Sequence, residues 1–127
     1  MSNALKTEFR NGILDILGAE ARRSAIQNFA DEGFFGSRWK KRDPKSKRKT
    51  GRILIDTGIL RASIQVKKDK TKGRVELTST TPNAKRHNEG LSGMPKRQFI
   101  GYHKDLEKSI NKEINGYRTR FLRKYIK

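Results

Sequence analysis

The sequence predicts an α+β domain in which long N-terminal and C-terminal helices pack on a small antiparallel β-sheet, with a basic loop projecting from it. Apolar residues recur at three- and four-residue steps near both ends of the chain, which is the period of an amphipathic helix. Between them, short stretches alternate apolar and polar residues, as strands do. The length suits one ordinary core, so we expect a single domain over residues 1–127.

The first helix is predicted over residues 1–32. Its apolar stripe comprises Leu5, Phe9, Ile13, Ile16, Leu17, Ala21, Ala25, Ile26 and Phe29. Gly12 and Gly18 interrupt it, and each costs roughly 1 kcal/mol relative to alanine inside a helix, so we expect close packing or a bend there. The Gly33-Phe34-Phe35-Gly36 run then ends the helix.

A short helix and the β-sheet are predicted over residues 53–102. Asp56 or Thr57 can accept the free amide hydrogens of a first helical turn. In that turn Leu60 and Ile64 share one face, so both are candidate core residues.

The strands come next. Ile64–Val66 and Val75–Leu77 alternate apolar with polar residues on either side of a charged loop, which predicts a β-hairpin. Residues 84–90 predict one helical turn and Gln98–Ile100 a third strand. The last helix is predicted over residues 103–127. Its apolar side carries Leu106, Ile110, Ile114, Tyr117, Phe121 and Tyr125.

Positive charge is concentrated in residues 38–52. The whole chain has a formal charge of +18, and this stretch holds nine basic residues against one acidic residue. It has no apolar side chain after Trp39, so we predict a solvated loop that binds acidic protein surfaces or nucleic acid; a merely flexible charged linker is the other interpretation. The predicted partner-binding residues are Arg38, Lys40, Lys41, Arg42, Lys45, Lys47, Arg48, Lys49 and Arg52.

Catalysis is not expected. The chain has no cysteine and only two histidines, His87 and His103, which excludes thiolate metal sites and cysteine nucleophiles. Glu89 follows His87 closely, but further metal ligands are missing around them, so we expect His87 to be a helix-end histidine bonded to backbone. Asp56-Thr57-Gly58 lacks the glycine-rich loop of a phosphate cradle. We therefore predict no enzyme, no cofactor and no metal.

The charge and apolar pattern also bears on binding to nucleic acid and to membranes. The basic stretch suits sequence-independent phosphate contacts, but the aromatic residues follow helical or strand spacing, so reading of base sequence is not expected. No apolar run reaches the roughly 18 to 20 residues of a membrane helix, and the start lacks a signal peptide. We expect a soluble, non-secreted protein that binds no membrane, because the core needs the apolar face of the last helix.

One series of motifs stands in a fixed order. It is Gly36-x-x-Trp39, the basic stretch, Leu54-x-x-Thr57-Gly58-x-Leu60-x-x-Ser63-Ile64, His87-x-x-Gly90 and Pro95-x-Arg97-x-Phe99-Ile100-Gly101. Together these motifs resemble the phage virion-morphogenesis family, the tail-completion proteins of long-tailed phages and related contractile particles. The predicted scaffold residues of the motifs are Trp39, Thr57, Gly58, Leu60, Ser63, Ile64, His87, Gly90, Pro95, Arg97 and Phe99.

The resemblance implies a structural subunit of a virion. Such a protein forms a ring, expected to be a hexamer, at the head-proximal end of the tail and joins the tail to the head. The implied partners are further copies of the chain, tail tube, terminator or connector subunits, and DNA in the channel. The implied location is the tail or neck of the virion, after assembly in the bacterial cytoplasm. The alternative is a free-standing basic protein that binds nucleic acid without sequence specificity.

Overall fold

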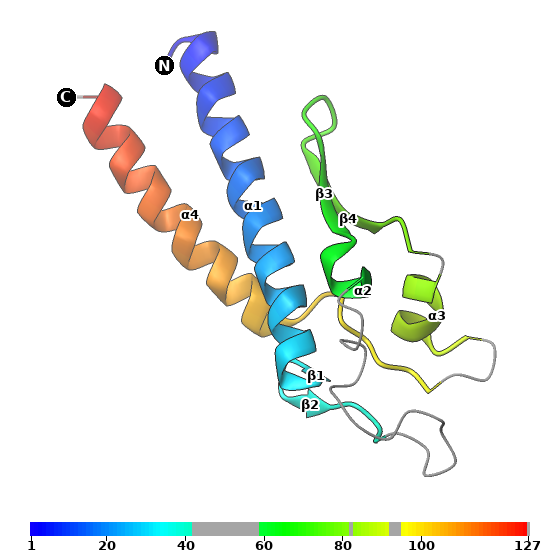
Figure 1. The fold of residues 1–127 in the computed structure, drawn as a ribbon. Coiled ribbons are helices and arrows are strands. Elements are labelled where there is room, and N and C mark those ends of the chain that lie inside the picture. Colours follow the sequence, from blue (N-terminus) through cyan, green and yellow to red (C-terminus); the bar gives the residue numbers. More distant parts are fainter. Residues whose placement is uncertain (42–58, 82, 92–94, 127) are drawn as a thin grey trace.

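The computed structural model describes residues 1–41, 59–81, 83–91 and 95–126 (Figure 1). Two long helices lie beside small antiparallel sheets, which confirms the predicted α+β class. The elements in chain order are α1 (Asn3–Asp31), β1 (Gly33–Phe34), β2 (Ser37–Arg38), α2 (Ile59–Ala62), β3 (Ile64–Asp69), β4 (Arg74–Ser79), α3 (Asn83–Glu89) and α4 (Lys104–Tyr125).

Helices α1 and α4 run antiparallel, so the two chain ends lie at the same end of the pair (Figure 1). The Ser2 hydroxyl accepts the Leu5 amide hydrogen at the start of α1, and His103 Nδ1 accepts that of Asp105 at the start of α4. Helix α1 ends at Asp31, and its C-cap Glu32, at a left-handed φ of 51°, turns the chain away and donates its amide to the Asn28 and Phe29 carbonyls. The two N-terminal caps satisfy amides, and the C-cap satisfies carbonyls, that have no partner inside a helix.

Two glycines of α1 let neighbouring elements approach closely. A methyl group at Gly12 would overlap the Tyr117 hydroxyl of α4, and one at Gly18 would lie 2.5 Å from Val66 Cγ1 of β3. The close packing expected at both positions is confirmed. Helix α1 is therefore the common support of α4 and of the β3–β4 hairpin.

Gly18→Ala is expected to lower the free energy of unfolding by about 1–3 kcal/mol, because the added carbon overpacks the contact with Val66. Gly116→Ala is the matched control. There the nearest atom, 3.1 Å away, is the mobile guanidinium end of Arg120, so the better helix propensity of alanine is expected to add up to about 1 kcal/mol. Urea unfolding of both variants measures the difference, and equal stabilisation would contradict the close packing.

The β3–β4 hairpin is longer than predicted. Its antiparallel register runs from Ile64 opposite Ser79 to Asp69 opposite Arg74, so β3 includes the first three residues of the predicted charged loop, Lys67, Lys68 and Asp69. Opposite charges face each other across the strands, which favours pairing, and the Asp69 carboxylate accepts the Lys72 amide hydrogen in the turn. Charged residues can therefore continue strands whose other face packs on α1.

The residues after α1 form a second hairpin, where only a helix end was predicted. Gly33 pairs with Arg38 and Phe34 with Ser37. The turn between them places Phe35 at φ 48° and Gly36 at φ 89°, the left-handed geometry of a tight two-residue turn. Strands of two residues are too short to show an alternating apolar pattern, which explains why the sequence did not indicate them.

The third strand predicted at Gln98–Ile100 is wrong. The segment belongs to no strand, and side chains take the place of a neighbouring strand. Asn88 Oδ1 accepts the amide hydrogens of Phe99 and Ile100 at 2.9 and 3.0 Å. From the other side, Asn28 Nδ2 donates to the Phe99 carbonyl at 3.1 Å. The backbone groups are satisfied without a sheet.

The main core lies where this extended segment crosses the C-terminal half of α1. Phe29 and Phe99 are fully buried and their ring centroids lie 4.7 Å apart. Ile64 closes the cluster from the start of β3. The buried members of the cluster are Ala25, Phe29, Trp39, Leu60, Ile64 and Phe99.

Candidate docking surface

The basic stretch begins on a fixed base. Trp39 is 7% exposed and its ring meets that of Phe29 edge-on at 5.7 Å. The indole Nε1 donates to the Gln98 carbonyl at 2.8 Å, and the Trp39 amide donates to the Glu32 carbonyl at 2.8 Å. Trp39 thus fixes the point at which the chain leaves the core.

Arg97 holds the next two residues. Its guanidinium Nε and Nη2 donate to the Lys40 carbonyl at 3.2 and 3.1 Å, and Nη2 also reaches the Lys41 carbonyl at 3.5 Å. The Arg97 amide donates to the His87 carbonyl at 2.7 Å. Arg97 is 9% exposed, so a buried residue links α3 to the start of the basic stretch by hydrogen bonds.

The side chains next to the anchoring residues Trp39 and Arg97 are cationic. Arg38, Lys40 and Lys41 are exposed, while the residues that hold them are buried. The other predicted binding residues, and two predicted motif residues, lie outside the described residues, and their roles stay predictions. These are Arg42, Lys45, Lys47, Arg48, Lys49, Arg52, Thr57 and Gly58.

The described chain that follows residue 58 is also anchored to the core. Leu60 is 8% exposed and Ile64 1%. Between them the Ser63 hydroxyl lies 2.6 Å from the Leu60 carbonyl oxygen, to which it donates, and 2.5 Å from the Ser79 hydroxyl. Ser63 therefore links the end of α2 to β4.

The motif residues of α3 lie beside Arg97. His87 is half-buried, and its buried Nδ1 has no hydrogen-bond partner among the described residues. Burial, and then the charge of Arg97, lower the pKa of His87, so the ring is neutral at neutral pH. The predicted bond from its side chain to backbone is wrong: its carbonyl accepts the Arg97 amide instead. Gly90 follows at φ 71° and Pro95 is half-buried.

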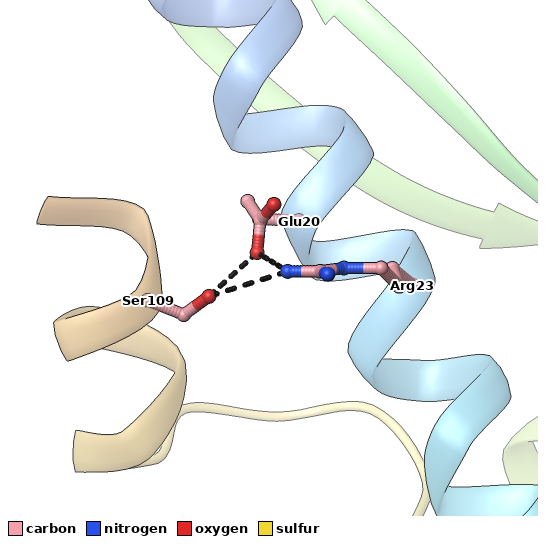
Figure 2. Close-up of polar contacts among 3 residues, drawn as sticks. All are labelled: Glu20, Arg23 and Ser109. Carbon is pink, nitrogen blue, oxygen red and sulfur yellow. Dashed lines mark hydrogen bonds and ion pairs between the residues drawn. The ribbon is translucent and has the colours of Figure 1, made fainter. Parts of the chain in front are cut away.

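A polar contact that we did not predict joins α1 to α4 (Figure 2). Glu20 Oε2 accepts from the Ser109 hydroxyl at 2.6 Å and also binds Arg23. Burial alone would raise the pKa of Glu20, but the hydrogen bonds from Ser109 and Arg23 and the charge of Arg23 outweigh it and lower that pKa. The carboxylate stays ionised and links the two helices.

Asn28 and Asn88 are further functional residues that sequence reasoning missed. Asn28 is 3% exposed, and its Oδ1 also accepts the Phe35 amide hydrogen at 3.0 Å. A signal exists for Asn28 and Glu20, because both are polar residues within the part of α1 that carries the apolar stripe. Buried polar side chains are hydrogen-bonded, so such positions mark where a helix holds another segment.

Among the residues that the structure describes, no three histidine, aspartate or glutamate side chains gather where they could hold a metal ion. Within the same part of the chain, none of the helices combines the length and apolar character needed to cross a membrane.

Comparison with known proteins identifies a family. A family model described as the phage virion morphogenesis family matches residues 2–117. The matched range contains all motif residues of the docking surface and ends at Tyr117, inside α4. No curated protein and no solved structure matches the chain.

Proposed function

Since the chain belongs to the phage virion morphogenesis family, we propose that it is a subunit that completes the phage tail and joins it to the head. Membership itself indicates a structural role in building the virion. The finer proposal places the chain in a ring at the head-proximal end of the tail, expected to be a hexamer. A ring requires one face of each copy to bind a different face of the next.

The observation that carries the proposal is the fixed base of the basic stretch. Trp39 and Arg97 hold its first residues through backbone contacts, so the exposed cations of Arg38, Lys40 and Lys41 are already positioned. A pre-organised surface loses less entropy on binding than a free tail does. This arrangement supports docking to the acidic faces of tail tube, terminator or connector subunits, with DNA in the channel as the other target.

We expect reversal of Lys45, Lys47, Arg48 and Lys49 to glutamate to abolish head–tail joining without unfolding the protein. None of the four has an apolar side chain that a core would need, and reversal replaces attraction to an acidic partner by repulsion. Electron microscopy of particles complemented with the variant counts joined heads and tails. Circular dichroism and thermal melting check the fold.

The matched control reverses Lys70, Lys72, Lys85 and Lys112, which are exposed elsewhere and change the net charge by the same amount. Joining should survive in this control. Normal joining with the first variant, or equal loss with both, contradicts docking through the basic stretch. The ring is contradicted if the protein stays monomeric alone and with tails while particles lacking it still join heads.

Duplex DNA binding separates the free-standing nucleic-acid binder from a virion subunit. A free-standing binder retains duplex at about 150 mM salt and loses affinity steeply above it. A ring subunit needs little affinity for DNA on its own.

A further inference from the structure

The free end of the α1–α4 pair differs in charge from the rest of α4. We call residues 1–10 and 118–126 the helix tip; both chain ends lie there (Figure 1). Residues 104–117 carry three basic and three acidic side chains, whereas residues 118–126 carry four basic and none acidic. All four are exposed, and none forms an ion pair among the described residues. They are Arg118, Arg120, Arg123 and Lys124.

Apolar side chains are exposed among these cations. Leu122, Ile126 and Met1 are 40%, 49% and 56% exposed. Arg118 precedes Leu122 by four residues, so the two share one flank of α4. Ile126 is the residue that caps α4, and its amide donates to the Leu122 carbonyl. Of the five large apolar side chains exposed in the described part of the chain, three therefore lie at the helix tip.

The helix tip is rigid because the inner side of α4 is held by α1. Phe121 is 4% exposed and its ring centroid lies 5.0 Å from that of Phe9. The Tyr125 hydroxyl donates to Glu8 Oε1 at 2.7 Å. These contacts use the inner side of the last turns, so the core does not account for the exposed Leu122 and Ile126.

The family match separates this part of α4 from the docking surface described above. It ends at Tyr117, so residues 118–126 lie outside it. The basic and apolar character of residues 118–126 is therefore a feature of this chain in addition to what the family model recognises.

We infer that the helix tip is a second docking surface, and that its partner is an acidic surface of a different protein with an apolar contact at its centre. The cations require an acidic partner, and Leu122 and Ile126 require an apolar one. A small apolar contact surrounded by charged pairs is the usual composition of a protein interface.

Other partners fit these residues less well. Nucleic acid would place phosphates against Leu122 and Ile126 without an apolar contact for them. A membrane surface needs a continuous apolar helix face, and that face of α4 is packed on α1. A second copy of this chain carries 13 acidic residues against 31 basic ones, so it is a poor acidic partner.

Photo-crosslinking tests the inference in cells that produce the particle. A benzophenone amino acid in place of Leu122 should crosslink the full chain to another protein, through an acidic segment identified by mass spectrometry. The same amino acid in place of Asn111, exposed on the same flank three turns earlier, should give no such product. A product with DNA, lipid or a second copy of the chain, or none at all, overturns the inference.

A charge arm completes the test. Arg118→Gln, Arg120→Gln and Arg123→Gln together should lower the yield of the Leu122 crosslink at least about tenfold. Lys104→Gln, Lys108→Gln and Lys112→Gln remove the same charge from the same helix and should leave the yield within about twofold, because the expected partner is selected at the tip. Equal losses would indicate net charge alone and overturn the inference. The result does not depend on head–tail joining, which concerns the basic stretch.

Discussion

Leu60→Asp is expected to remove the cooperative unfolding transition of the protein. Leu60 is 8% exposed and lies in the core with Phe29, Trp39, Ile64 and Phe99. A carboxylate there loses its water and finds no cation in that cluster, which costs more than the lost apolar contact alone. We expect a loss of at least about 4 kcal/mol, against a total stability on the order of 5–15 kcal/mol for a domain of this size.

Circular dichroism and urea unfolding measure this effect. Leu122→Asp is the matched control, since it makes the same change on a helix at a side chain that is 40% exposed. The control should unfold within about 1 kcal/mol of the parent protein. Leu60→Met, which conserves volume, should cost less than about 1.5 kcal/mol. A folded Leu60→Asp protein of near-parent stability would contradict the position of Leu60 in the core.

The two long helices could be predicted because their signal is local. Apolar residues at helical spacing are present in the sequence itself. The hairpin was also predictable from alternation, although its charged ends were not. Cross-strand pairs such as Lys67 opposite Glu76 extend strands without any apolar residue.

The sequence could not show that Gln98–Ile100 forms no strand, because a segment held by side chains can have the same local pattern of residues as a strand. The difference lies in what binds the backbone. At Phe99 that role belongs to Asn28 and Asn88, which are distant in sequence. The residues around an asparagine do not show which backbone segment its side chain binds.

The contacts of the candidate site could not be predicted from the sequence. The motif series contains Trp39 and Arg97. The Arg97 guanidinium, however, donates to the backbone carbonyl of Lys40, and the lysine side chain gives no indication of that hydrogen bond. Every residue has a backbone carbonyl group, so the amino-acid type does not show which carbonyl accepts a hydrogen bond. The structure alone reveals that a buried arginine fixes the start of the basic stretch.

Asn28→Asp should destabilise the protein by about 3 kcal/mol at pH 7, although it replaces a single nitrogen by oxygen. The amide donates to the Phe99 carbonyl from Nδ2 and accepts the Phe35 amide hydrogen at Oδ1. A carboxylate keeps the acceptor but sets a charged oxygen against the Phe99 carbonyl oxygen at 3 % exposure. Asn115→Asp, at an exposed position of α4, makes the same change and should alter stability by less than about 0.5 kcal/mol.

The pH dependence gives the sharper test of Asn28→Asp. Burial and the facing carbonyl raise the folded-state pKa of the new carboxyl above its unfolded value of about 3.9. A raised pKa means that stability is present below the unfolded pKa and is lost as pH rises through the folded one. The difference from the parent protein in urea unfolding should therefore shrink from pH 7 to pH 5, because the protonated acid again donates to Phe99.

Titration of groups that both proteins share does not alter this comparison of Asn28→Asp with the parent protein. The lowered pKa of Glu20 means that its contribution is present above the ordinary value of 4.5 and is lost only as pH falls through its folded-state pKa. Between pH 7 and pH 5 this residue stays ionised in both proteins, and the titration of His87 is common to both. A difference that stays constant with pH would show that Asn28 does not donate to the Phe99 carbonyl, and that the extended segment is held in another way.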